Sequence, residues 1–282
     1  MQQSNPGERR LGIVCVLMSA IFFATGGLLI KLNSWNAVTI NGVRSLLALS
    51  VMLLYMKHTG HHFRFNKAVL FGTIANSGMT VTFTIATKMT TAANAIVLQF
   101  MMPAFVVVLL WIFWKQKPDG VTLATVAVSL LGMACFFIDS LSAGNMAGNL
   151  IAMLSGFLYA FVFLMKQIPG ADFMSSVVIS YGLNFLIGLP FLLQETDFGA
   201  SNLITIVLLG IVQVGFSYVC LDIGLDRVPP VAASLISMIE PILNPIMVAV
   251  FYHEMIGPIA LVGAAIVLGS ATFSNLYSLK KG

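Results

Sequence analysis

Two ionisable side chains lie alone within long apolar stretches of the sequence, and their types suit them to binding charged groups. Arg44 and Glu240 each lie near the middle of such a stretch. If these stretches cross a bilayer, leaving either charge in lipid would cost at least ~2.5 kcal/mol. Each charge must therefore face protein or a water-filled cavity. Arg44 could hold a substrate carboxylate, and Glu240 could hold an amine or a coupling proton. Alternatively, the two could pair with each other or with backbone carbonyls as structural contacts.

Further polar side chains recur at helical spacing in the same stretches. At about 100° per residue, Ser237, Glu240 and Asn244 fall within roughly 60° of one another. The other polar stripes are Asn76, Thr80, Phe83 and Thr87; Gln213 and Ser217; Ser155 and Tyr159; and Asn94 and Leu98 with Gln99 beside them. A single stripe commonly serves helix packing, but several together predict a polar pocket for an amphipathic solute. The candidate substrate ligands are Arg44, Asn76, Thr80, Asn94, Gln99, Tyr159, Gln213, Ser217, Ser237, Glu240 and Asn244.

The composition of the whole chain indicates that these side chains lie in a membrane. Of 282 residues, 59% are hydrophobic and 9% are charged, and the mean hydropathy is +0.97. A soluble domain carries about 25% charged residues, so a soluble globular protein is excluded. Disordered chains and disulfide scaffolds are excluded as well. Cys15, Cys135 and Cys220 lie far apart in apolar stretches and predict inert, buried thiols.

The elements that must position the polar residues are apolar segments of about 20 residues, the length of a transmembrane helix. Ten are predicted, at 12–33, 36–56, 68–87, 91–114, 120–138, 148–166, 173–193, 202–222, 230–252 and 257–277. Their length and the lack of period-two alternation favour helices over strands. The first segment is too long for a cleaved signal peptide and is expected to be the first helix. The predicted fold class is therefore an all-α integral membrane protein.

The distribution of basic residues predicts the orientation of the chain. With ten spans and an inner amino terminus, 11 of the 14 Lys and Arg residues are inside, 2 are outside and Arg44 is within a span. This asymmetry agrees with the positive-inside rule, so both termini are expected to be cytoplasmic in a multi-pass protein of the cell (inner or plasma) membrane. The inner loop 57–67 contains His58, His61 and His62. It predicts a basic loop beside anionic lipid rather than a metal site.

An internal repeat divides the chain into two halves. Residues 72–120 align with 210–258 at a constant shift of 138, which places Pro103 on Pro241. Five spans in each half would make the two halves face opposite ways in the membrane. The predicted units are a first repeat at 1–138, an outer loop at 139–147 and a second repeat at 148–282. Pro103, Pro241 and Pro245 are interior to their spans and predict either hinges or fixed bends.

Several motifs together resemble a known family. They are Thr91-Ala92-Ala93-Asn94-Ala95 through Leu98 to Pro103-Ala104-Phe105; Gly224 through Val228-Pro229 to Ala233-Ser234-Leu235-Ile236 and Glu240-Pro241; Arg44 with Leu46, Leu47 and Ala48; and Glu254, Gly263 and Gly269. This pattern is similar to the EamA branch of the drug/metabolite transporter superfamily. The resemblance implies a basket of ten helices in two inverted five-helix repeats. Gln116 departs from it, because an acidic residue is common there, and Glu254 then lacks a symmetric counterpart.

The resemblance implies a secondary transporter of small organic metabolites, such as amino acids or related amphipathic compounds, that exports them by alternating access. The alternatives are an uptake permease for an organic cation or other nutrient, and a receptor that transports nothing. The sequence has no phosphate-binding Gly-x-x-x-x-Gly-Lys loop and no nucleophile–base pair within the spans, so enzymatic activity is not expected. The expected partners are a small-molecule substrate, the lipid bilayer and, as an option, a coupling proton. No cofactor, metal or nucleic acid is expected, and monomer and homodimer remain open.

Overall fold

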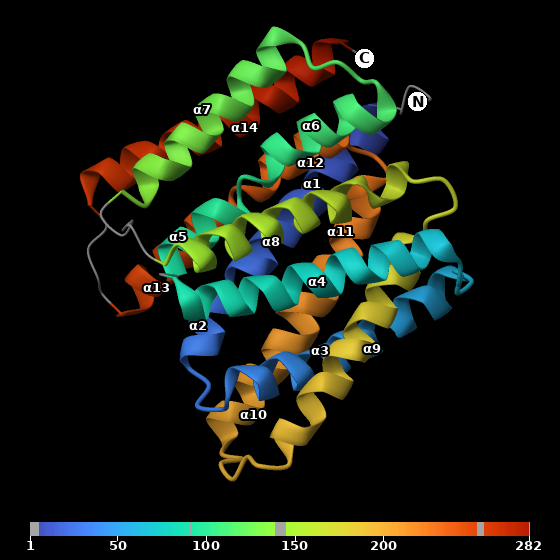
Figure 1. Ribbon diagram of the computed structural model, residues 1–282, viewed down its shortest axis with the longest axis vertical. Helices are drawn as coiled ribbons and strands as arrows, with labels where there is room; N and C mark the ends of the chain where they lie inside the picture. Colours follow the sequence, from blue (N-terminus) through green and yellow to red (C-terminus); the bar gives the residue numbers. More distant parts are fainter. Residues whose placement is uncertain (1–5, 91, 139–144, 253–256, 282) are drawn as a thin grey trace.

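The computed structural model describes residues 6–90, 92–138, 145–252 and 257–281, and in these ranges the chain is helical and contains no strand (Figure 1). The helices of the first half are α1 Pro6–Ala24, α2 Gly26–Lys31, α3 Ala37–Thr59, α4 Lys67–Met89, α5 Ala92–Gln99, α6 Met102–Trp114 and α7 Gly120–Phe136. Those of the second half are α8 Met146–Leu164, η1 Met165–Gln167, α9 Phe173–Leu192, α10 Ala200–Val207, η2 Leu208–Phe216, α11 Ser217–Leu225, α12 Pro230–Ser237, α13 Glu240–Tyr252 and α14 Pro258–Lys281. The predicted all-α class is confirmed for these residues.

Short polar side chains fix where several helices begin. The side chains of Asn36, Asn66, Asp119, Asn145 and Asp172 each accept a hydrogen bond from a backbone amide in the first turn that follows. Such caps satisfy amide groups that have no partner within the helix. The last residue of each of these connections is therefore a local signal for the start of a helix.

Seven helical stretches of the described chain are long and apolar enough to cross a membrane. Three further apolar helices, Gly120–Phe136, Pro230–Asn244 and Pro258–Ser274, are shorter than that. A crossing needs about 20 residues when the helix runs along the bilayer normal. Ten crossings therefore stay a prediction, although each of the ten predicted intervals contains helix.

The helix limits of the second half repeat those of the first. At the shift of 138 residues, α5 falls on α12 and α6 falls on α13, with the same first and last positions. At the same shift, α7 and α14 begin at equivalent residues, Gly120 and Pro258. The agreement extends the weak sequence repeat to the level of secondary structure.

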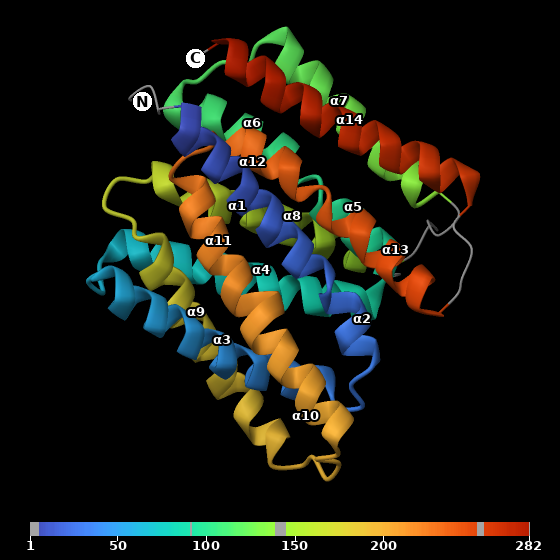
Figure 2. The ribbon, with the colours of Figure 1, turned by 180° about the vertical axis from the view of Figure 1, so that it is seen from behind.

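The two halves interlock instead of forming separate bodies. The most extensive helix contacts are α3 with α9, α4 with α8, α7 with α14 and α1 with α11, and each pair joins one half to the other (Figures 1 and 2). At the α3–α9 contact, a Cβ atom added to Gly42 would lie 2.7 Å from the Cα atom of Gly188. Glycine is therefore required for the two backbones to approach this closely.

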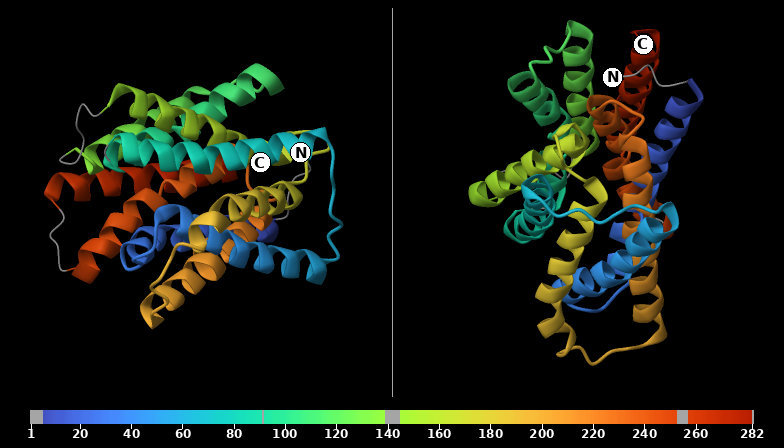
Figure 3. Two further views of the ribbon diagram at one scale, coloured as in Figure 1. Left: turned by 60° about the horizontal axis from the view of Figure 1, so that its bottom comes forward. Right: turned by 90° about the vertical axis from the view of Figure 1, so that its right-hand side faces the viewer.

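The connections between helices define two sides of the molecule. The start of α1, the end of α14, and the α3–α4 and α8–α9 connections lie on one side (Figure 1). The α2–α3 connection lies on the other side. The α7–α14 pair forms one edge of the bundle, and the α9–α10 connection forms the far end of its long axis (Figures 1 and 3). The predicted inner loops are thus together on one side.

Candidate functional site

Two symmetry-related helix breaks bring backbone ends into the interior. The first separates α5, which ends at Gln99, from α6, and the second separates α12, which ends at Ser237, from α13. Pro103 and Pro241 are each the second residue after the break, where the missing amide hydrogen costs no helical bond. The prolines therefore mark interruptions and not bends within continuous helices. A hinge role for Pro103, Pro241 and Pro245 stays a prediction.

The second break corrects one expectation about the polar stripes. Ser237 ends α12 and Glu240 begins α13, so the two do not lie on one face of a continuous helix. Ser237 is buried, whereas Glu240 and Asn244 are half-buried. Because α13 starts at Glu240, the carboxylate lies at the positive end of that helix, which favours a negative charge.

The Glu240 carboxylate is unpaired in a largely enclosed position. Its Oε2 atom is buried and has no hydrogen-bond partner among the described residues. The charge of Glu240 acts electrostatically on Tyr159, Tyr181 and Tyr218, which are all buried. A buried carboxylate without a partner is costly, so Glu240 is a candidate for holding either a cationic group or a proton.

Aromatic rings pack against one another in the same region. The ring centroids of Tyr181 and Tyr218 are 5.3 Å apart in an edge-to-face arrangement, and Phe23 meets Tyr218 at the same distance. Tyr159 packs edge-to-face on Phe100 and on Phe163. These contacts hold the rings of four different helical segments in fixed orientations.

Arg44 has the charge opposite to that of Glu240, and its side chain is hydrogen-bonded to a residue of its own helix. Its Nη2 and Nε atoms donate to Asn41 Oδ1 at 2.8 and 3.3 Å, one turn earlier on α3. The described residues give Arg44 no ion pair, so the expected alternative of direct pairing with Glu240 is not realised. The charges of both residues nevertheless reach Tyr181. Arg44 and Glu240 therefore both lie in the neighbourhood of Tyr181 but form no ion pair with each other.

Gln213 lies in a stretch whose geometry the sequence analysis did not predict. Residues Leu208–Phe216 form a π-helix within the expected span 202–222. Gln213 Nε2 donates to the backbone oxygen of Phe23 at 3.4 Å, while its buried Oε1 atom has no partner among the described residues. Ser217 Oγ donates to the Gln213 carbonyl at 2.6 Å. Such π-helical turns are frequent at functional sites.

Other predicted ligands take part in contacts between helices. Asn76 Nδ2 donates to Ser180 Oγ and its Oδ1 accepts from Tyr218 Oη, both at 2.9 Å. Thr80 Oγ1 donates to the Asn76 carbonyl at 2.7 Å. Asn76 therefore ties α4 to α9 and α11 with both ends of its amide, and its contact with a substrate stays a prediction.

Gln99 and Asn94 make similar contacts between α5 and α8. Gln99 Nε2 donates to Ser155 Oγ at 2.8 Å, and Ser155 Oγ donates to the Met79 carbonyl at 3.0 Å. Asn94 Nδ2 lies 3.2 Å from Asn149 Oδ1. The structure thus separates the predicted ligands into a central group, Arg44, Tyr159, Gln213 and Glu240, and a group that joins helices, Asn76, Asn94 and Gln99. Thr80 and Ser217 bond to backbone carbonyls of their own helical stretches.

Three residues of the central region were missed by the sequence analysis. Tyr181 and Asn184 lie on α9, and Tyr218 lies on α11. Each is a tyrosine or asparagine within a largely apolar segment, and this was the signal that could have identified them. Glu254, which the family resemblance singled out, lies outside the described residues.

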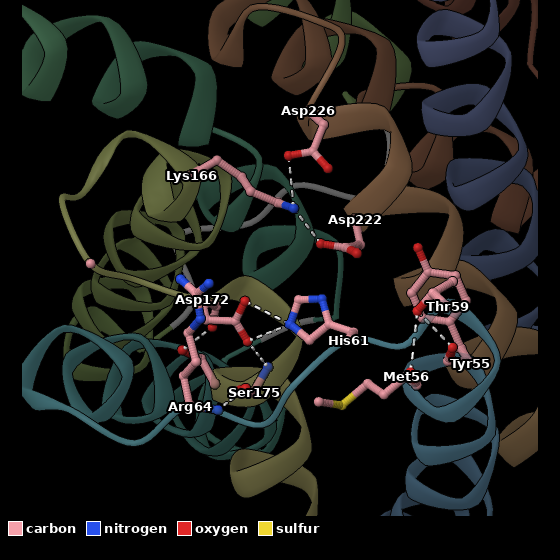
Figure 4. A network of polar contacts seen from close by, with 12 residues as sticks. Tyr55, Met56, Thr59, His61, Arg64, Lys166, Asp172, Ser175, Asp222 and Asp226 are labelled. Atoms are coloured by element: carbon pink, nitrogen blue, oxygen red, sulfur yellow. Dashed lines mark hydrogen bonds and ion pairs between the residues drawn. The ribbon is translucent and has the colours of Figure 1, made fainter.

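An ionic cluster lies at the side that carries the predicted inner loops (Figure 4). Lys166 Nζ lies 2.5 Å from Asp222 Oδ1 and 2.9 Å from Asp226 Oδ1, which joins the end of α8 to α11. Nearby, His61 Nε2 lies 2.8 Å from Asp172 Oδ1. His61 thus contacts a carboxylate of the other half, and the position of loop 57–67 beside anionic lipid stays a prediction. Glu8 and Arg227 form another contact between the halves, at 2.7 Å.

Hydrogen bonds keep the Asp172 carboxylate ionised. Burial opposes its ionisation, but the side-chain hydrogen bonds from Ser175 and His61 and the Ser175 backbone amide outweigh burial and lower the pKa of Asp172 below its ordinary value. Arg64 adds a backbone hydrogen bond to Ser175 Oγ at 3.0 Å. The loop between α3 and α4 is therefore fastened to the start of α9.

A groove between α7 and α14 lies away from all of these residues. Its volume is about 560 Å³, and its lining includes Val121, Val128, Ile266 and Phe273. The wall offers almost no polar groups, so it lacks the convergent donors and acceptors of a site for a charged solute.

Comparison with known proteins shows that each of the two repeats matches the same family. A sequence model of the EamA-like transporter family matches residues 10–138 and again residues 146–276. A crystal structure of another protein superposes with a TM-score of 0.82 at 15% sequence identity, and the match covers 95% of this chain and 98% of that one. At this identity the likeness shows a shared fold alone. No curated protein matches the sequence significantly.

Proposed function

The chain belongs to the EamA-like transporter family, and from that premise we propose that it exports small zwitterionic metabolites, amino acids or related amphipathic compounds, by alternating access. Transport is secondary and needs no nucleotide. The protein spans the cell (inner or plasma) membrane ten times, in two inverted repeats, with both termini in the cytoplasm. The positive-inside distribution of Lys and Arg and the common side of α1's start and α14's end support this orientation.

The observation that carries the proposal concerns Arg44 and Glu240. Their side chains are opposite in charge and lie near Tyr181, and neither has an ion-pair partner among the described residues. Arg44 has an uncharged partner, Asn41, and Glu240 has a buried oxygen without a partner among the described residues. An ammonium group at Glu240 and a carboxylate at Arg44 would each form a charge-assisted hydrogen bond. A zwitterion supplies both groups and adds no net charge to the interior.

The ionic contacts between halves support a mechanism of alternating access. His61–Asp172 and Glu8–Arg227 join the two repeats at the side assigned to the cytoplasm. We assign to them the role of closing the inner side, and they separate when the carrier opens to the cytoplasm. The interruptions before α6 and α13 supply the points at which the helix halves can reorient.

A second candidate substrate is an organic cation without a carboxylate. Its support is the set of three tyrosines, Tyr159, Tyr181 and Tyr218, around one carboxylate, because aromatic faces attract an alkylammonium group. Arg44 argues against it, because a second positive charge would repel such a ligand. The zwitterion satisfies both charged residues and is therefore preferred.

Thermal-shift measurements on the purified protein test the proposal. The probes are an amino acid, the amine that lacks its carboxylate, and the acid that lacks its amine. A ligand at 100 times its Kd stabilises by about 2.7 kcal/mol, so binding is detectable as a raised Tm. We expect a shift with the amino acid alone. A larger shift with the amine would favour the cation carrier, and no shift with any of the three would contradict both.

A further inference from the structure

We infer that Asn184 of α9 contacts the substrate and selects for an uncharged hydrogen-bonding group on it, a hydroxyl or a carboxamide. The inference rests on the proposed function and adds a subsite to it. Asn184 is 1% exposed, and neither its Nδ2 nor its Oδ1 atom has a hydrogen-bond partner in the part of the chain that the structure describes. Among the described residues, no other side chain has two such atoms.

Asn76 is an example of a buried amide with a structural role, because both ends of its side chain have hydrogen-bond partners. It is as fully buried as Asn184, at 0% exposed, and its amide donates to Ser180 while its carbonyl accepts from Tyr218. Buried polar groups are normally satisfied in this way, because an unpaired one destabilises the folded state. Asn184 departs from that pattern, which implies a partner that is part of the functional cycle.

Asn184 lies close along α9 to Tyr181, the residue that neighbours both Arg44 and Glu240. It lies one helical turn after Tyr181 on α9 and therefore shares a face with it. The charges of Arg44 and Glu240 both reach Tyr181. One turn further along the same face, Gly188 meets Gly42 of α3. Along α9, Asn184 thus lies between Tyr181 and the tight contact of two helices.

The chemistry of an amide defines the group that it selects. A carboxamide offers two donor hydrogens and an acceptor oxygen, so it pairs with a group that both donates and accepts. Arg44 and Glu240 hold the charged groups of the zwitterion, and Asn184 is then free to contact the side chain of the substrate. A site with a buried hydrogen-bonding group rejects the apolar analogue strongly, because its own polar atoms then stay unpaired.

Two variants test this role by stability and by selectivity. Asn184→Leu keeps a similar shape and removes the polar atoms, while Asn76→Leu is the matched control in a bonded position. We expect Asn184→Leu to raise the Tm of the ligand-free protein and Asn76→Leu to lower it. The selectivity arm compares threonine with valine and glutamine with methionine. We expect the wild type to prefer the polar member of at least one pair by about tenfold or more, and Asn184→Leu to abolish that preference.

The following results would overturn the inferred role of Asn184 or separate it from the proposed function. A lower Tm for Asn184→Leu with unchanged selectivity would overturn the inference and make Asn184 structural. A higher Tm with unchanged selectivity would overturn it too, because the unpaired amide would then take no part in the choice of substrate. If Asn184→Leu does not fold, Asn184→Ala serves in the selectivity arm with the same expected loss. If the wild type binds none of the four amino acids, the proposed function fails, whereas the Tm comparison still reports on Asn184 itself.

Discussion

The His61 side chain and the Asp172 carboxylate join the two halves of the chain across 111 residues of sequence, with Nε2 at 2.8 Å from Oδ1 and 3.0 Å from Oδ2. Asp172 also caps α9, because its Oδ2 atom accepts a hydrogen bond from the Ser175 amide at 2.9 Å. One carboxylate thus fixes both the start of a helix and the loop from the other half (Figure 4). This contact between the halves depends on one carboxylate, so a single substitution removes it.

Replacing Asp172 should destabilise the protein in a pH-dependent way. Because its pKa is lowered in the folded state, the carboxylate contributes stability above the ordinary Asp value of about 4, and this is lost as the pH falls through the folded pKa. Asp172→Asn should therefore lower the Tm at pH 7, and the difference from the wild type should disappear only when the pH falls below the lowered pKa of Asp172. Asp172→Ala should cost about 1 kcal/mol more, because asparagine still caps the helix and alanine does not. Equal Tm values of Asp172→Asn and wild type at pH 7 would refute the role of this charge.

Glu240→Gln should weaken amino-acid binding strongly. The substitution keeps the shape of the side chain and removes the charge, and a hydrogen bond to a charged group contributes about 1.5–3 kcal/mol. We expect the apparent affinity to fall by about tenfold or more in exchange assays and in gradient-driven assays alike. Loss of proton-driven transport with normal exchange would show that Glu240 carries the coupling proton and does not hold the amine.

Arg44→Lys should reduce transport although it preserves the positive charge. Lysine lacks the planar fork that binds a carboxylate through two parallel hydrogen bonds. It also cannot reproduce both hydrogen bonds to Asn41 Oδ1. The check is KM for the amino acid, measured alongside Tm to separate binding from folding. A variant with wild-type Tm and wild-type KM would exclude a bidentate carboxylate clamp at this position.

Gly188→Ala should destabilise the α3–α9 contact. The added Cβ atom would lie 2.5 Å from the Gly42 Cα atom and 3.0 Å from the Val38 carbonyl oxygen, and backbone atoms cannot move aside cheaply. We expect a loss of about 1–3 kcal/mol. Gly182→Ala, on the same helix with nothing within 4 Å of the new atom, is the control. It should gain up to about 1 kcal/mol from helix propensity. A stabilising Gly188→Ala would contradict the packing described for this pair.

The elements of the fold follow from local signals in the sequence. Apolar length gave the helical intervals, and the prolines coincide with both interior breaks, since proline needs no amide partner in a first turn. The interruption near Thr25 likewise coincides with the glycine pair Gly26-Gly27. The π-helix at 208–216 has no comparable signal and depends on how neighbouring helices pack.

The candidate site was predictable only in part. Arg44 and Glu240 stand out because a charge within an apolar segment is rare. Periodicity placed Ser237 and Glu240 on one face, which is wrong because the helix breaks between them. The role of each polar residue depends on its partner from another helix. Asn76 finds two partners and Asn184 finds none among the described residues, although the two look alike in sequence.

Counterflow in proteoliposomes tests the central claim most directly. Vesicles that contain the purified protein are loaded with an unlabelled amino acid and diluted into a trace of the labelled compound, without nucleotide. The account predicts transient accumulation of label in wild-type vesicles, little accumulation with Glu240→Gln, and none in protein-free vesicles. Accumulation of label at the wild-type rate in Glu240→Gln vesicles, or no accumulation of any amino acid by the folded wild type, would contradict it.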